Sequence, residues 1–151
     1  DFDESFYRAL VTLDDRMSAY RKFVFLFPRS LKHPRSSQEY FVRYCRERGL
    51  EYAVDENLEN LKVEPGTAYL AIKQQDVVRV VKQGRTAGLK CGRDYGLLAY
   101  NDIPSYEVID EGITALTIDW RKMGDEVADF VLNGTPVQEY LPTEVRLRNS
   151  L

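Results

Sequence analysis

Residues 95–120 read YGLLAYNDIPSYEVIDEGITALTIDW, and this stretch decides the fold. Residues 96–100 are a short apolar run of strand length, and the polar residues 101–104 (NDIP) end it sharply. The proline suits the first turn of a helix. Residues 113–118 then alternate in the manner of a second strand. Polar side chains therefore follow a buried strand at its carboxyl end, which is the edge where ligands bind in open α/β sheets.

The rest of the chain repeats this alternation of strands and helices. We expect strands at 23–27, 51–54, 67–72, 96–100, 113–118 and 144–147, and helices at 3–20, 36–48, 75–87 and 121–133. Strands that are apolar throughout, such as 23–27 (FVFLF), are typical of a sheet covered on both faces. The order predicts an α/β fold with three layers, built on a doubly wound, mostly parallel sheet. Right-handed crossovers would bring the loops 29–37, 73–76 and 101–102 to one edge.

The composition is that of one globular domain. The chain has 151 residues, of which 44% are hydrophobic, and its formal net charge is −3. Domains that bind DNA by themselves are usually basic, so any contact with DNA would need another domain. The sequence shows no signal peptide and no apolar run near the ~20 residues of a membrane span, which indicates a cytoplasmic protein without membrane contact. Because the chain opens on what looks like a helix, we expect it to be a fragment of something longer.

The common catalytic and cofactor motifs are missing from the sequence. It contains no GxGxxG, GxxxxGK[ST] or GxSxG pattern. His33 is the single histidine, and Cys45 and Cys91 match no metal or redox spacing, so we expect two reduced, packed thiols. Asp102 or Asp119 could act as a general base, but neither has a paired acid. We therefore expect no catalysis, no metal and no cofactor.

The predicted sheet edge instead offers groups that bind. Asn101 and Gln74 can both donate and accept hydrogen bonds, and Lys73 adds a cation. Such a set suits a polyhydroxylated or carboxylated ligand. Trp120 could stack on the apolar face of a sugar ring, or it could pack in a core or an interface, and the sequence leaves both open.

Several segments, in order, resemble the effector domain of the lactose/galactose-repressor superfamily. Residues 97–104 (LLAYNDIP) resemble the signature G-F/Y-D/N-D-x-P, and residues 112–120 (GITALTIDW) are similar to L-T-T-I-x-Q/D-aromatic. Residues 68–88 resemble the unit A-x-x-A-N-D-x-x-A-x-G-x-x-x-A-x-x-x-G, and residues 141–147 resemble the ending L-P-x-x-L/V. The motif Tyr-Asn-Asp-x-Pro, together with Gly-Ile-Thr, is most similar to the corresponding motifs of GntR-type transcriptional regulators that carry a sugar-repressor-like C-terminal domain.

This resemblance implies a periplasmic-binding-protein-like (type I) fold of two subdomains around a cleft. Residues 1–151 would form an effector-binding and dimerisation domain, mainly the second subdomain. The first subdomain and a winged helix-turn-helix would lie outside this chain. The implied function is ligand sensing, of a sugar or sugar derivative, in a bacterial DNA-binding transcriptional regulator. The alternatives are a solute-binding protein for carbohydrate transport and a flavodoxin-like or small hydrolase enzyme.

The resemblance also assigns residues by position. Asn101 corresponds to the residue that bonds ligand hydroxyls, and Trp120 to the aromatic that stacks on the ligand. Lys73 corresponds to the asparagine of A-N-D. Arg35 or Ser37 falls near the arginine that binds sugar hydroxyls.

At two of these places the chain departs from the family. Residues 72–74 read IKQ in place of A-N-D, and residues 37–41 read SQEYF in place of R-x-x-G-F, so the arginine is lost or displaced to Arg35. A lysine at the floor of the cleft suggests an acidic or phosphorylated ligand. Alternatively the pocket is degenerate, and regulation runs through other contacts.

Two surfaces are implied as well. The helix 121–133 would normally pack on the first subdomain, and without it we expect its apolar stripe to dock on another copy or on its own sheet. The stripe consists of Met123, Val127, Phe130 and Val131. The helices containing 77–81 and 103–109 correspond to family dimer surfaces and predict a homodimer.

Overall fold

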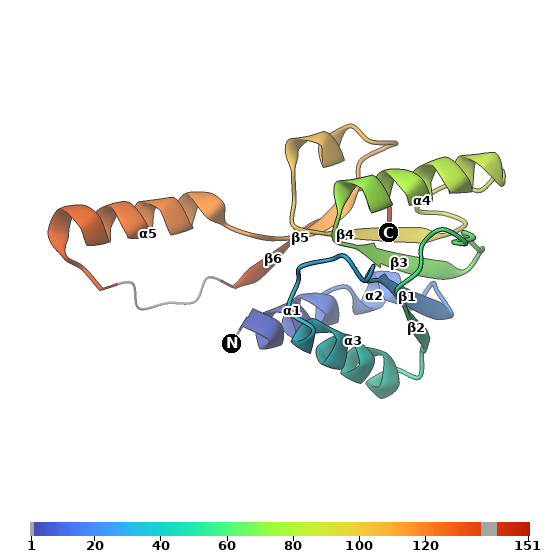
Figure 1. The fold of residues 1–151 in the computed structure, drawn as a ribbon, viewed down its shortest axis with the longest axis horizontal. Helices are drawn as coiled ribbons and strands as arrows, with labels where there is room; N and C mark the ends of the chain where they lie inside the picture. The colour runs from blue at the N-terminus through green and yellow to red at the C-terminus, as the bar shows by residue number, and fades with distance from the viewer. Residues whose placement is uncertain (1, 137–141) are drawn as a thin grey trace.

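One sheet organises the chain, with the strand order β2-β1-β3-β4-β5-β6 (Figure 1). The computed structural model describes residues 2–136 and 142–151, without the side chains of Phe2, Asp3 and Trp120. The strands are β1 (Lys22–Leu26), β2 (Glu51–Asp55), β3 (Thr67–Ala71), β4 (Gly96–Tyr100), β5 (Thr114–Ile118) and β6 (Thr143–Arg146). The helices are α1 (Phe2–Val11), α2 (Asp14–Met17), α3 (Ser36–Glu47), α4 (Gln74–Thr86) and α5 (Trp120–Asn133), with a 3₁₀ turn η1 (Pro104–Glu107). Strands β1 to β5 are parallel and β6 is antiparallel to β5, which confirms the predicted sheet.

Helices cover both faces of this sheet and make the predicted three layers. α1, α2 and α3 lie on one face, and α4 and η1 lie on the other (Figure 1). Successive strand residues point to opposite faces, so Phe23 and Phe25 pack in the first core while Val24 and Leu26 pack in the second. Every residue of β3 and β4 is buried. Burial on both faces explains why the strand sequences are apolar throughout.

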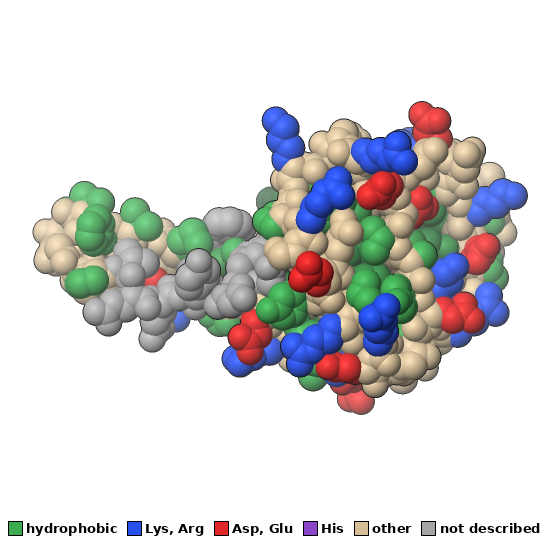
Figure 2. All heavy atoms as spheres, turned by 60° about the horizontal axis from the view of Figure 1, so that its bottom comes forward, with side chains coloured by type: hydrophobic (Ala, Val, Ile, Leu, Met, Phe, Trp, Pro, Cys, Tyr) green, Lys and Arg blue, Asp and Glu red, His purple; other side chains and the backbone are tan. Residues whose placement is uncertain are grey.

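Helix α5 projects away from the sheet, beyond the end of β5 (Figure 1). Its side chains Val127, Phe130 and Val131 are 50%, 52% and 73% exposed, and Figure 2 shows hydrophobic groups on the surface of this projecting part. The prediction that the stripe docks on its own sheet is therefore wrong, because the chain carries the helix past the sheet edge. Docking on another copy stays a prediction. Like every other helix within the described residues, α5 is not long and apolar enough to cross a membrane.

The valines of α4 face inwards. Val77, Val80 and Val81 are 0%, 0% and 4% exposed and belong to the core on that face of the sheet. Their spacing of three and four residues places them on the one side of the helix that covers the sheet. These valines therefore cannot contribute to the dimer surface predicted for this helix, and only its opposite side is free for such a contact. Dimerisation itself stays a prediction.

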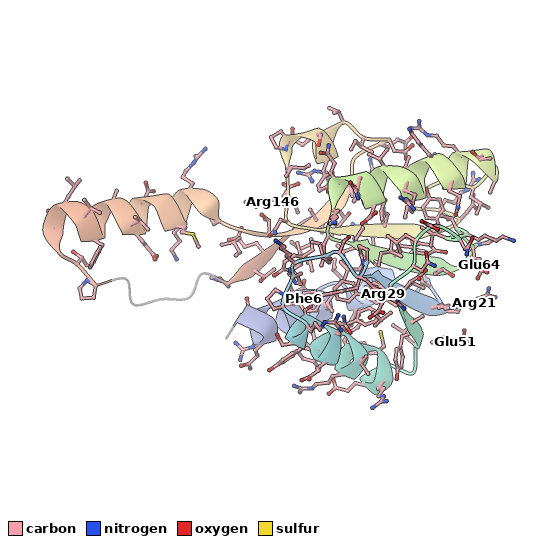
Figure 3. The ribbon with its side chains drawn as sticks, viewed as in Figure 1. Phe6, Arg21, Arg29, Glu51, Glu64 and Arg146 are labelled. Carbon is pink, nitrogen blue, oxygen red and sulfur yellow. The ribbon has the colours of Figure 1, made fainter. Side chains whose placement is uncertain are left out.

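The first predicted helix is divided in two. Thr12 donates its hydroxyl to the carbonyl of Ala9, and the N–H of Leu13 bonds to Leu10 rather than to the residue four positions back. A threonine hydroxyl competes with helical hydrogen bonds in this way, and its branched side chain lowers helix propensity. Phe6 of α1 lies between its helix and the sheet (Figure 3), with its ring 5.5 Å from that of Tyr100.

Two other connections are less regular than a continuous α/β alternation. The predicted helix over 103–109 is only the 3₁₀ turn η1. Residues 56–66 join β2 to β3 without a helix. Leu58, Leu61 and Val63 from this loop pack on the sheet face that a helix would otherwise cover.

Candidate functional site

The chain leaves β1 and β3 towards opposite faces of the sheet. These two strands are hydrogen-bonded neighbours, yet β1 is followed by α3 on one face and β3 by α4 on the other. Loops that diverge in this way leave a crevice outside the carboxyl ends of the strands, and ligands of open α/β sheets bind there. The topology therefore singles out the loops after β1 and β3.

Side chains connect these loops to each other and to the segment after β4. The ammonium Nζ of Lys73, two residues after the end of β3, donates to Ser30 Oγ in the β1 loop at 3.3 Å. The amide Nε2 of Gln74 donates to Ser105 Oγ, in η1, at 2.9 Å. Three loops that are distant in sequence thus form one polar surface, and Lys73 connects the loops that follow β1 and β3.

Asn101 completes this edge at the end of β4. Its φ of 62° is left-handed, a conformation that asparagine tolerates better than most residues. Its N–H donates to the carbonyl of Leu116 at 3.0 Å, which fixes the backbone and leaves the half-buried residue at the edge. The preceding Tyr100 ring lies edge-on to His33 of the β1 loop, with centroids 5.3 Å apart.

The carboxylates near this edge are engaged in structural contacts. Both oxygens of Asp102 accept from the guanidinium of Arg148, each at 2.8 Å. Asp119 caps α5 by accepting from a backbone N–H three residues further on, at 3.0 Å. Glu56 pairs with Arg29 at 3.3 Å. Asp102 and Asp119, the two candidate bases, are therefore used in holding the fold.

Asp76 is a buried acid that the sequence analysis missed. It lies in the first turn of α4, is 2% exposed, and its Oδ2 has no hydrogen-bond partner among the described residues. Burial raises the pKa of this carboxyl, and the charges of Arg79 and Lys73 oppose that shift. Nearby Tyr106 is buried as well, which raises its pKa to about 12. The signal in the sequence was an acid beside the apolar stripe of the helix.

The remaining predicted site residues differ in their accessibility. Arg35 is exposed at the beginning of α3. Ser37 is 2% exposed, and its hydroxyl donates to the carbonyl of Pro34 at 2.8 Å, so its proton is used within its own turn. The side chain of Trp120 lies outside the described residues, and only its backbone position at the beginning of α5 is known. Ser30, the partner of Lys73, was not predicted as a site residue.

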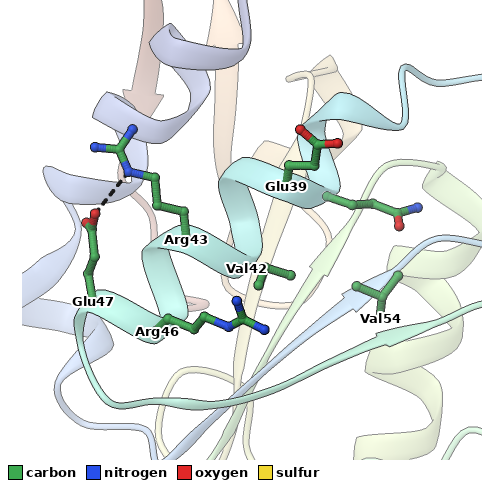
Figure 4. A pocket seen from close by; sticks show the side chains of 7 residues that line it. Glu39, Val42, Arg43, Arg46, Glu47 and Val54 are labelled. Atoms are coloured by element: carbon green, nitrogen blue, oxygen red, sulfur yellow. Dashed lines mark hydrogen bonds and ion pairs between the residues drawn. The ribbon is translucent and has the colours of Figure 1, made fainter.

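A separate hollow of about 540 Å³ lies between α3 and β2 (Figure 4). It is lined by Gln38, Glu39, Val42, Arg43, Arg46, Glu47 and Val54. Its charged groups are partly satisfied, because Arg43 pairs with Glu47 at 2.9 Å and Arg46 donates to Tyr52 Oη at 3.0 Å. It lies at the side of the sheet rather than at the strand ends. No group of three or more His, Cys, Asp or Glu residues suited to a metal ion occurs within residues 2–136 and 142–151.

Comparison with known proteins gives a consistent result. Residues 17–151 match the family described as periplasmic binding protein-like domain. No curated protein sequence matches the chain. Among solved structures, the chain is similar to a sugar-binding transcriptional regulator (LacI family) from Escherichia coli complexed with phosphate. The TM-score is 0.74 and the sequence identity is 15%. The match covers 100% of this chain and 61% of the regulator's chain.

Two further structures are similar in the same way. The Escherichia coli transcriptional repressor ascG has a TM-score of 0.75 and 16% identity, with coverage of 100% of this chain and 62% of that one. A LacI family transcriptional regulator from Arthrobacter sp. FB24, in complex with lactose, has a TM-score of 0.73 and 19% identity, with coverage of 99% and 63%. The chain thus spans less than two thirds of the length of these proteins, and at such identities the likeness concerns the fold.

Proposed function

The chain belongs to the periplasmic binding protein-like domain family, with the type I fold of that family, and on this premise we propose that it is the ligand-sensing domain of a bacterial DNA-binding transcriptional regulator. The observation that carries the proposal is the polar surface at the carboxyl edge, where Lys73 and Gln74 connect three loops. A small polar ligand seated there would contact elements from both halves of the sheet. The proposed domain binds and does not catalyse, in line with the structural engagement of Asp102 and Asp119.

The proposed ligand is a sugar or sugar derivative, and its contacts come from the edge residues. Asn101 and Gln74 would bond hydroxyls through their amides, and Lys73 would donate from its ammonium. Arg35 would approach from the beginning of α3. We assign Trp120 to stacking on the ligand, and Ser37 only to accepting a hydrogen bond, because its proton is engaged.

We further propose that residues 1–151 are mainly the second of two subdomains. The share of the similar regulators that the chain spans, about 61%, supports this division. The bare stripe on α5 supports it too, because an amphipathic helix is stable when its apolar face is covered. The first subdomain and the DNA-binding domain would lie outside this chain, and a regulator of this kind would work as a homodimer in the cytoplasm. The GntR-type assignment rests on the sequence motifs at residues 100–104 (YNDIP) and 112–114 (GIT).

In this proposal the ligand acts by population shift. It binds the closed arrangement of the two subdomains better than the open one, and so favours closure. Closure changes the spacing of the DNA-binding domains, so ligand binding and DNA binding become linked reciprocally. A solute-binding protein for carbohydrate transport is the alternative, and it would bind ligand in the same crevice without any affinity for DNA.

A thermal-shift screen tests the proposal. The complete gene product, including any sequence that flanks these residues, would be screened against sugars, sugar acids and sugar phosphates. A ligand at 100 times its Kd stabilises the folded state by about 2.7 kcal/mol. We expect a hit that is lost in Asn101→Ala and kept in Asn133→Ala, whose asparagine lies on α5. A folded protein that binds DNA but responds to no ligand would contradict ligand sensing and favour the degenerate pocket.

A further inference from the structure

The cations and carboxylates at the carboxyl edge are not balanced. The β1 loop and the start of α4 contribute Arg29, Lys32, Arg35 and Lys73. Within the described part of the chain, Arg29 pairs with Glu56, whereas the other three have no carboxylate within 4.0 Å. Asp102 and Asp119, at the ends of β4 and β5, are committed to Arg148 and to the cap of α5. Residues 27–35 and 72–75 contain no Asp or Glu, so the loops after β1 and β3 present positive charge to the solvent.

Lys73 concentrates this charge at the crevice. Its ammonium has three hydrogen-bond donors, and one of them is used on the Ser30 hydroxyl, so that two remain for a ligand. Lys73 is also the N-cap of α4, a helix of 13 residues. The first N–H groups of a helix have no intrahelical acceptor, and that end carries partial positive charge. The Lys73 ammonium and the N-terminus of α4 therefore both favour a negatively charged ligand.

The nearby acid does not cancel this charge. Asp76 is 2% exposed, so its carboxyl is turned into the protein rather than towards a ligand in the crevice. An acidic ligand between the loops after β1 and β3 would thus meet ammonium and amide donors, while the exposed carboxylates of Glu39 and Glu107 lie on α3 and η1.

We propose that the effector carries an acid group, a carboxylate or a phosphate, and that Lys73 is the residue that selects it over a neutral sugar. This inference rests on the proposed function and names the chemical class of its ligand. The ammonium makes a charge-assisted hydrogen bond to either kind of ligand, but only an acid adds the Coulomb attraction between opposite charges. An acid loses that added attraction when Lys73 is replaced by an uncharged residue, and a neutral sugar does not.

The test uses isothermal titration calorimetry on the complete gene product. The panel matches each neutral sugar with its acid and its phosphate, for example glucose with glucuronate and glucose 6-phosphate, and galactose with galacturonate and galactose 6-phosphate. Inorganic phosphate alone is included. We expect binding within the acid or phosphate members, and a Kd that rises about tenfold to a hundredfold in Lys73→Met. Lys73→Arg, which keeps the charge, should retain the preference for acids.

Lys82→Met is the matched control, because Lys82 is exposed on the same helix but lies further from its N-terminus. It should bind as the unchanged protein does, and equal urea midpoints for both methionine variants would show that folding is intact. Neutral sugars that bind as tightly as their acids, with no effect of Lys73→Met, would overturn this inference and leave the proposed function standing. If inorganic phosphate still binds to Lys73→Met, the bound phosphate is an adventitious ion only. That result would also count against the inference. A folded protein that binds no member of the panel would overturn both.

Discussion

Helices α4 and α5 carry the same kind of apolar stripe, yet only α4 buries it within this chain. The valines 77, 80 and 81 of α4 are at most 4% exposed, whereas Val127, Phe130 and Val131 of α5 are between 50% and 73% exposed. The difference comes from the direction in which each helix leaves its strand. Both follow an interior strand, but α4 returns over the sheet, while α5 projects away from it (Figure 1). An apolar stripe indicates that a helix packs against a partner, but it does not identify that partner.

The largest expected effect on stability comes from replacing a phenylalanine by alanine, which we compare between the sheet and α5. Phe25 in β1 is 1% exposed, with its ring 5.2 Å from that of Phe41, so Phe25→Ala should cost about 3–5 kcal/mol of unfolding free energy. Phe130 on α5 is 52% exposed, and Phe130→Ala should change it by less than about 0.5 kcal/mol in the 151-residue chain. Urea unfolding measures both.

The complete gene product sharpens this contrast. If the first subdomain covers α5, Phe130→Ala should cost clearly more there than in the 151-residue chain. An equal, negligible cost in both would contradict the proposed cover over α5.

The next largest effect concerns an ion pair within the sheet layers. Arg148 holds both oxygens of Asp102 and also donates to the carbonyl of Ile113, and its side chain is 16% exposed. Arg148→Met should cost about 2–3 kcal/mol, because it leaves the Asp102 carboxylate without its partner. Arg146→Met is the control, since Arg146 (Figure 3) pairs with Glu144 at an exposed site and should cost less than about 1 kcal/mol. Similar costs for the two variants would show that the Asp102 pair is not structural.

A smaller effect depends on pH. Burial raises the pKa of Asp76 above its ordinary value of 3.8, so the folded state binds this proton more tightly than the unfolded state. The stabilisation is present below the ordinary pKa and is lost as the pH rises through the raised value. Asp76→Asn should therefore raise the urea midpoint at pH 7 and lose that advantage near pH 3.

The control for Asp76 is Asp125→Asn, at an exposed position of α5. We expect it to change the urea midpoint little at either pH. An Asp76→Asn variant that is less stable than the unchanged protein at pH 7 would show that the ionised carboxylate is favourable in its place.

The smallest effect is local to α5. Asp119 caps this helix, and the loss of such a cap costs about 1 kcal/mol. Asp119→Ala should speed hydrogen exchange of the α5 amides and leave the urea midpoint of the sheet layers unchanged. A shift in that midpoint would mean that α5 and the sheet unfold together.

The sequence predicted the regular part of the fold well. Residues 96–100 became β4 without a change of boundary, because a buried strand has a continuous apolar sequence and Asn101 ends it. The division at Thr12 was missed, since the helical spacing of apolar residues continues across the break. Which residues of α4 face the sheet was not predicted either, because a stripe does not identify its partner.

The candidate site shows the same limit. Lys73 and Gln74 could be placed at the strand ends from the alternation of elements alone. The bond between Lys73 and Ser30 could not be predicted, because it spans 43 positions and depends on β1 lying beside β3. Asp76 was missed because its burial follows from how α4 is rotated on the sheet.

Hydrogen exchange with and without ligand tests the central claim most directly. The complete gene product would be compared before and after addition of the acid or phosphate that stabilises it in the screen. We predict slower exchange in peptides covering 28–37, 72–76 and 101–106, with no change in 38–54, which contains most of the hollow between α3 and β2 (Figure 4). Protection confined to 38–54 would contradict the account, because the ligand would then bind at the side of the sheet and not at its carboxyl edge.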